Sequence, residues 1–181
     1  YMIFNGLTRL IEGIKNFKFN NDHIEYLREC GFDDQAFLDY LLNMELNLDI
    51  WAVEDGTVVF ANEPLITVKG PMIQAQLIET MLLLSVNYPT LITTKASRIV
   101  TAARGRAVLE FGARRAHGFD ASLEGARSAI LAGAVGTSHT LAGQKFGAYV
   151  SGTMAHSYVQ MHDNEYDAFL SFAKINPDNS I

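Results

Sequence analysis

The amino-acid sequence predicts an α/β fold in two parts. Apolar residues recur at helical spacing through the first fifty residues, and short β-strands are expected between residues 48 and 68. Beyond residue 107, strand and helix patterns alternate, which is typical of a parallel sheet with right-handed crossovers. We therefore place a portion of an N-terminal α/β domain, with helices and a small β unit, at residues 1–95, and the first part of a second α/β domain at residues 96–181.

Three helices are expected in the first fifty residues. Leu7, Leu10, Ile11 and Ile14 lie on one helical face. The run 20–22 offers capping oxygens for a helix through residues 24–27, and the pair 33–34 does the same for an amphipathic stretch at 37–42. The first half of the N-terminal part is therefore predicted to be helical.

The pattern then changes to short strands and long apolar helices. Strands are expected at residues 48–52, 57–60 and 65–68, with turns at Glu54–Gly56 and Asn62–Pro64. A helix that is apolar nearly all round begins at Pro71, which is typical of a helix buried between layers or in a subunit interface. We expect Tyr88–Pro89 to end it, and a second helix to follow over residues 93–103.

The last third is expected to contain three strand–helix units. Strands are predicted at residues 108–111, 134–137 and 148–153, and helices at 123–131, 141–143 and 163–173. Reactive residues of parallel α/β folds gather at the carboxyl ends of the strands. The loops to inspect are therefore those that follow the three predicted strands.

Composition narrows the function classes. Of 181 residues, 49% are hydrophobic and 19% are charged, which favours a folded globular chain over a disordered one. The net charge of −6 argues against a general nucleic-acid binder. No run of about 20 apolar residues predicts a membrane span. The one cysteine, Cys30, excludes an internal disulfide or a cysteine-rich zinc site and suits a reducing cytoplasm.

The three loops are rich in Gly, Ser, Thr and His, and the first adds two arginines. Glycine lets backbone N–H groups approach a ligand closely, and arginine offers a planar fork to a carboxylate or phosphate. Phe111, beside Arg114, has the ring needed to stack on an aromatic ligand. A small anionic ligand is therefore expected at this edge.

His156 is the sharpest single candidate, because an imidazole can act as base, metal ligand or phosphoryl acceptor near neutral pH. A zinc site is disfavoured, since His156 and His162 lack further ligands at suitable spacing. A hydrolase built on His156 and Ser157 is also disfavoured, because no Gly-x-Ser-x-Gly motif is present.

At these loops the sequence resembles the nicotinate phosphoribosyltransferase family. The matching pieces cover nearly the whole chain in one order: Asn62–Leu65, Val68–Pro71, Glu79–Leu83, Asn87, Glu110–His117, Gly136–Gly143 and Val150–Ser157. The resemblance implies a type II phosphoribosyltransferase, in which an N-terminal α/β domain precedes an irregular TIM-like barrel. Residues 96–181 would then supply the first βα units of that barrel.

The resemblance also implies a reaction and its partners. Members form nicotinate mononucleotide from nicotinate and phosphoribosyl pyrophosphate, with ATP hydrolysis, in cytoplasmic NAD biosynthesis. They act as homodimers with a shared active site, use Mg²⁺ bound by the substrate phosphates, and hold neither a tightly bound organic cofactor nor a protein-ligated metal. No nucleic acid or membrane takes part.

The motif positions imply roles for individual residues. His156 corresponds to a histidine that ATP phosphorylates transiently, and Ser157 lies beside it. Phe111 corresponds to the ring that stacks on the pyridine, and Arg114 to a contact with phosphate or the ribosyl end. Ser138 and His139 occupy the position that faces the pyridine substituent, although the family more often has Asn where His139 stands. Thr153 is counted among the substrate-binding residues of the third loop.

Alternatives remain open. Nicotinamide-using relatives carry an aspartate in the second loop, and residues 136–139 offer no carboxylate. A quinolinate-using relative would call for more basic residues than these loops contain. The chain is expected to be a segment of a longer enzyme that lacks later barrel strands, so the isolated chain is expected to be inactive. A catalytically silent interaction module is the alternative from another class.

Overall fold

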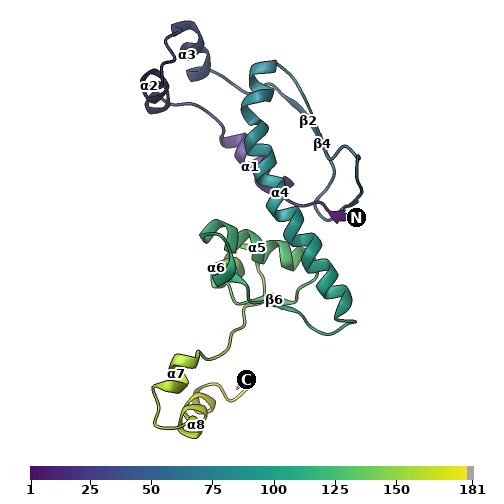
Figure 1. The fold of residues 1–181 in the computed structure, drawn as a ribbon, viewed down its shortest axis with the longest axis vertical. Helices are drawn as coiled ribbons and strands as arrows, with labels where there is room; N and C mark the ends of the chain where they lie inside the picture. The colour runs from purple at the N-terminus through teal and green to yellow at the C-terminus, as the bar shows by residue number, and fades with distance from the viewer. Residues whose placement is uncertain (179–181) are drawn as a thin grey trace.

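A long helix organises the molecule. The computed structural model describes residues 1–178. In chain order the elements are β1 (Met2–Ile3), α1 (Leu7–Asn16), α2 (Asn21–Glu29), α3 (Gln35–Leu42), β2 (Asp49–Ala52), β3 (Val58–Val59), β4 (Ile66–Lys69), α4 (Met72–Ala102), β5 (Leu109–Glu110), η1 (Ala113–Arg115), α5 (Phe119–Leu131), β6 (Gly136–Thr137), α6 (Thr140–Phe146), α7 (His156–Gln160) and α8 (Glu165–Ile175). Figure 1 shows α4 running through the molecule, with the N-terminal elements along one half and α5, α6 and β6 beside the other.

The three predicted N-terminal helices are confirmed, together with two of their caps. The side chain of Asn20 accepts the His23 N–H and the His23 ring accepts the Asn20 N–H, which forms a capping box at the start of α2. The side chain of Asp34 accepts the Phe37 N–H at the start of α3. The apolar faces of these two helices meet in a small core of Ile24, Leu38 and Leu41. Local sequence signals were therefore sufficient to predict the helices of this region.

The small β unit is confirmed and gains one strand. β2 and β4 pair antiparallel, with Ile50 opposite Val68. β3 pairs instead with β1, placing Met2 opposite Val59. A two-residue strand is too short to leave a periodic pattern, so the sequence did not predict β1.

The predicted break at Tyr88–Pro89 is wrong, because α4 continues through it to Ala102. A proline inside a helix removes one hydrogen bond and costs about 3 kcal/mol. Pro89 is fully buried, and the Ser85 carbonyl that loses its helical donor faces Gly6. A Cβ at Gly6 would overlap that carbonyl oxygen. Tertiary packing therefore overrides the local preference of proline.

The N-terminal segment supports the same part of α4. The Thr90 hydroxyl accepts the Asn5 N–H and donates to the Asn5 carbonyl, both at 3.1 Å. The Ile3 N–H donates to the Thr94 hydroxyl at 2.8 Å. These contacts lie close to Pro89 and help explain why the helix continues through a residue that usually ends one.

The second part follows the predicted alternation of strand and helix. β5 and β6 pair in parallel, with α5 between them in the chain, and Val150 adds a parallel bridge to Thr137. The third predicted strand, at 148–153, is reduced to that bridge, and α7 was not predicted. A TIM-like barrel is not confirmed by these few parallel rungs within residues 1–178. The expected domain boundary between residues 95 and 96 falls inside α4 and stays a prediction.

The C-terminal helices lie apart from the sheet. Figure 1 shows α7 and α8 at one end of the chain, reached by an extended segment that leaves the neighbourhood of β6. Tyr158 packs against His162 and Phe172 within this pair. None of the helices within residues 1–178 combines the length and the apolar character that a membrane span requires.

Candidate functional site

Two of the three predicted loops meet at the carboxyl edge of the parallel strands. Glu110 lies opposite Thr137, and Thr137 lies opposite Val150. Phe111 and Ser138 therefore emerge side by side from neighbouring strands, as expected for a parallel sheet. The third loop starts at the same edge and then runs away toward α7.

The carboxylate of Glu110 connects the first two loops. It accepts the Gly112 N–H through one oxygen and the Thr137 hydroxyl, at 2.6 Å, through the other. The Ser138 N–H donates to the Glu110 carbonyl at 3.0 Å. Sequence reasoning did not single out Glu110 or Thr137 as site residues, because these contacts depend on strand pairing and leave no local pattern.

In the first loop, Phe111 and Arg114 are both available to a ligand. The Phe111 side chain is partly exposed, at 42%. Arg114 belongs to the short helix η1 and is exposed. Among residues 1–178, no side chain forms an ion pair with its guanidinium. The planar fork of Arg114 is therefore free to bind a carboxylate or a phosphate.

A pocket of about 210 Å³ lies beside this loop, between α4, η1 and α5. Tyr88, Glu110, Arg115 and Ser122 are among its lining residues. Burial raises the pKa of the Tyr88 hydroxyl, and the negative charges of Glu110 and Glu124 add to this increase. Tyr88 therefore stays protonated and donates to the Ala121 carbonyl at 3.1 Å.

In the second loop, His139 acts as the N-cap of α6. Its Nδ1 accepts the Ala142 N–H at 3.4 Å, which assigns the proton of the neutral ring to Nε2. Nε2 lies 3.0 Å from the Ser122 hydroxyl, and that hydroxyl donates to the Phe119 carbonyl. Both ring nitrogens are thus occupied within the protein. The expected role of His139 toward a ligand stays a prediction, whereas Ser138 has no such internal side-chain partner in the described chain.

The third loop starts at this edge, but its candidates His156 and Ser157 lie beyond it on α7. His156 is the first residue of α7, and Thr153, His156 and Ser157 are exposed. The structure thus groups Phe111, Arg114 and Ser138, and places His156 with Ser157 on a separate helical pair (Figure 1). Within residues 1–178, no three His, Cys, Asp or Glu side chains are arranged as a metal site.

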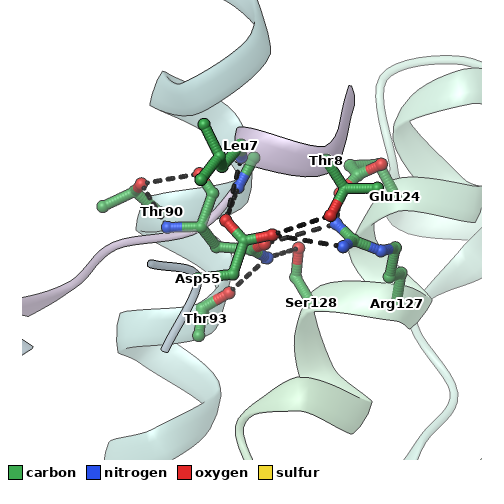
Figure 2. Close-up of polar contacts among 10 residues, drawn as sticks. Leu7, Thr8, Asp55, Thr90, Thr93, Glu124, Arg127 and Ser128 are labelled. Carbon is green, nitrogen blue, oxygen red and sulfur yellow. Dashed lines mark hydrogen bonds and ion pairs between the residues drawn. The ribbon is translucent and has the colours of Figure 1, made fainter. Parts of the chain in front are cut away.

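A buried polar network joins the two parts of the chain, and the sequence did not reveal it. Figure 2 shows Asp55 between Leu7 and Arg127. Asp55 accepts the N–H groups of Gly6 and Leu7 at 2.9 and 2.8 Å, and pairs with Arg127 at 3.3 Å. Asn5, fully buried, donates to the hydroxyls of Thr93 and Ser128.

A cavity of about 380 Å³ borders this network between α1, α5 and α6. Its charged lining residues are Arg9, Arg127, Lys145, Glu12, Asp120 and Glu124. Arg127 is held there by Glu124 and Asp55. The balance of charges indicates no preference for an anion or a cation at this place.

Comparison with known proteins gives one consistent result. Residues 1–87 match the nicotinate phosphoribosyltransferase (NAPRTase) N-terminal domain. The chain is 44% identical over 177 residues to nicotinate phosphoribosyltransferase pncB2 of Mycobacterium tuberculosis, covering 98% of this chain and 38% of that protein. It is 44% identical over 179 residues to nicotinate phosphoribosyltransferase of Bacillus subtilis, covering 98% and 36%.

A solved structure agrees with the sequence matches. The crystal structure of human nicotinic acid phosphoribosyltransferase superposes with a TM-score of 0.82 at 32% identity, over 88% of this chain and 33% of that one. The chain thus spans little more than a third of the length of the proteins it matches.

Proposed function

Because the chain belongs to the nicotinate phosphoribosyltransferase family, we propose that the protein containing it forms nicotinate mononucleotide and pyrophosphate from nicotinate and phosphoribosyl pyrophosphate. The single observation that carries this proposal is the 44% identity extending over 98% of the chain, which includes all three loops. Such a reaction feeds NAD biosynthesis. We expect the 181 residues alone to be inactive, since they span only 38% of that relative.

The first two loops are proposed to bind the pyridine substrate. Phe111 would stack on the ring, and Arg114, which has no internal ion pair among residues 1–178, would bind a carboxylate or phosphate oxygen. Ser138 would hydrogen-bond the substituent of the pyridine. The second loop carries no carboxylate that would repel the negative charge of nicotinate.

The chemical step requires little covalent help from the protein. Loss of pyrophosphate develops positive charge on the ribose, and the pyridine nitrogen donates its electron pair to C1 of that ring. Holding the two substrates in line and stabilising the leaving phosphates account for most of the catalysis. Mg²⁺ would enter with these phosphates, as it prefers phosphate oxygens and water to a dedicated protein cage.

His156 is proposed to couple ATP to this reaction. A ring nitrogen would attack the γ-phosphorus of ATP, the bond to the bridging oxygen would break, and ADP would leave. Water would later cleave the P–N bond and release phosphate. The exposed ring of His156 suits a phosphoryl acceptor, with Ser157 and Thr153 close in sequence as hydroxyl donors to the phosphate.

A homodimer with a shared active site is proposed for the whole protein. α4 exposes large apolar side chains, among them Met72 at 80% and Leu84 at 71%. Exposed apolar surface of this kind is typical of an interface.

The free, exposed thiol of Cys30 suits a reducing compartment, and we propose that the enzyme works in the cytoplasm.

Nicotinate-dependent release of pyrophosphate by the full-length protein tests the proposal. Wild-type protein is expected to turn over, and Arg114→Ala is expected to lower kcat/KM at least about a hundredfold through the lost charge-assisted contact. Arg106→Ala is the matched control, because Arg106 is exposed and forms no ion pair in the described chain. Equal activity of wild type and Arg114→Ala would contradict the proposed role of Arg114 in substrate binding.

A further inference from the structure

Glu110 and Thr137 form a four-point connection between the first two loops. One carboxylate oxygen of Glu110 accepts the Gly112 N–H, and the other accepts the Thr137 hydroxyl at 2.6 Å. The Thr137 oxygen in turn accepts the His139 N–H at 3.0 Å, and the Glu110 carbonyl accepts the Ser138 N–H. The carboxylate therefore reaches both the loop that carries Arg114 and the loop that carries Ser138.

The connection is tight and partly shielded from water. Thr137 is fully buried, so water cannot replace the carboxylate as the partner of its hydroxyl. A short O–H···O⁻ bond to a carboxylate is about twice as strong as a neutral one. A Cβ at Gly112 would lie 2.9 Å from Glu110 Oε1, so a side chain there would force this carboxylate to shift.

The carboxylate is used as an acceptor and not as an ion-pair partner. Among residues 1–178, no Lys, Arg or His forms a salt bridge with Glu110. Both of its oxygens are committed to loop contacts. Its role in this structure is therefore geometric.

We propose that Glu110 is a positioning residue that fixes the loop of Phe111 and Arg114 against the loop of Ser138, and so sets the spacing of the groups that hold the pyridine substrate. This inference rests on the proposed function. Misplacement of binding groups by about 1 Å can cost roughly a hundredfold in rate. Loss of the connection is expected to weaken use of nicotinate without touching the ATP step at His156.

Four variants of the full-length enzyme test this role. Glu110→Ala and Thr137→Val each remove the contact and are expected to lower kcat/KM for nicotinate by about ten- to a hundredfold, with a raised KM for nicotinate and an unchanged KM for ATP. Thr137→Ser keeps the hydroxyl and is expected to recover most of the loss seen in Thr137→Val. Glu110→Gln has one acceptor oxygen in place of two, so it is expected to recover only part of the loss seen in Glu110→Ala. Glu25→Ala, at an exposed site on α2, is the control.

Three results would overturn the proposal. They are an activity of Glu110→Ala within twofold of wild type, a loss in Thr137→Ser as large as in Thr137→Val, and an equal rise of KM for nicotinate and ATP. The second would mean that the hydroxyl of Thr137 is not what connects the two loops.

Hydrogen exchange separates this proposal from the proposed function. In the full-length protein, Glu110→Ala should speed exchange of the amides at Gly112 and His139, whether or not nicotinate is turned over. Unchanged exchange at both amides contradicts the positioning role. An inactive wild type with faster exchange in the variant contradicts only the proposed function.

Discussion

Arg127 Nη2 lies 3.3 Å from Asp55 Oδ2, which ties a turn of the N-terminal β unit to helix α5 across 72 residues of sequence (Figure 2). The same carboxylate accepts the first N–H groups of α1. The side chain of Asp55 is 14% exposed and that of Arg127 is 19% exposed, so both are mostly buried. The pair therefore belongs to the framework that places the N-terminal part against the sheet that carries the candidate site.

Removing Asp55 should destabilise the protein. Asp55→Ala leaves two helix N–H groups and a mostly buried guanidinium without their acceptor, so the free energy of unfolding is expected to fall by about 2–4 kcal/mol. Urea unfolding measures this change. Asp33→Ala, at an exposed carboxylate, is the control and is expected to stay within about 0.5 kcal/mol. Equal stabilities of the two variants would mean that the network contributes little.

Gly6 should tolerate no side chain. Its φ is +116° and a Cβ would overlap the Ser85 carbonyl, so Gly6→Ala combines backbone strain with a collision against a helix backbone. We expect a loss of about 3 kcal/mol or more, seen as a lower Tm. Gly31→Ala is the matched control, since Gly31 has φ of +92° but open space around it, and should cost only about 1–2 kcal/mol. Similar losses in both would remove the argument for close packing at Pro89.

His139 can be tested as a helix cap against its expected role in substrate binding. Asn is a strong N-cap residue, so His139→Asn should cost less than about 1 kcal/mol and leave KM for nicotinate near that of wild type. His139→Ala should cost about 1–2 kcal/mol. A large rise of KM in His139→Asn, with stability preserved, would assign the ring to the substrate instead.

His156 should be needed for the ATP effect alone. His156→Ala is expected to abolish transfer of the γ-phosphate of ATP to the protein, detected with labelled ATP, while folding stays near normal because the ring is exposed. His23→Ala, at the capping box of α2, is the control and should still accept the label. Label retained in His156→Ala would place the phosphoryl acceptor elsewhere.

Local signals predicted the local parts of this fold. The capping side chains of Asn20 and Asp34 predicted two helix starts, because a cap acts within three residues of its own position. The alternation of strand and helix after residue 107 predicted the parallel pairing of β5 and β6. The continuity of α4 through Pro89 depends on packing against Gly6, which lies 83 residues earlier in the sequence. No local sequence pattern predicts such a contact.

The candidate site shows the same division. The positions of Phe111, Arg114 and Ser138 at one edge followed from strand order, since carboxyl ends of parallel strands meet there. Glu110 and Thr137 were not predicted as a pair, because their contact arises from the register between two strands. The path of the chain after Val150, which carries His156 away to α7, likewise has no sequence signal that we recognised.

The most direct test of the central claim is a substrate comparison with the full-length wild-type protein. Nicotinate, nicotinamide and quinolinate are each supplied with phosphoribosyl pyrophosphate, Mg²⁺ and ATP, and mononucleotide formation is followed by mass spectrometry. We expect efficient turnover of nicotinate, stimulated by ATP, and little turnover of the other two. Preference for nicotinamide or quinolinate, or no turnover of any, would contradict it.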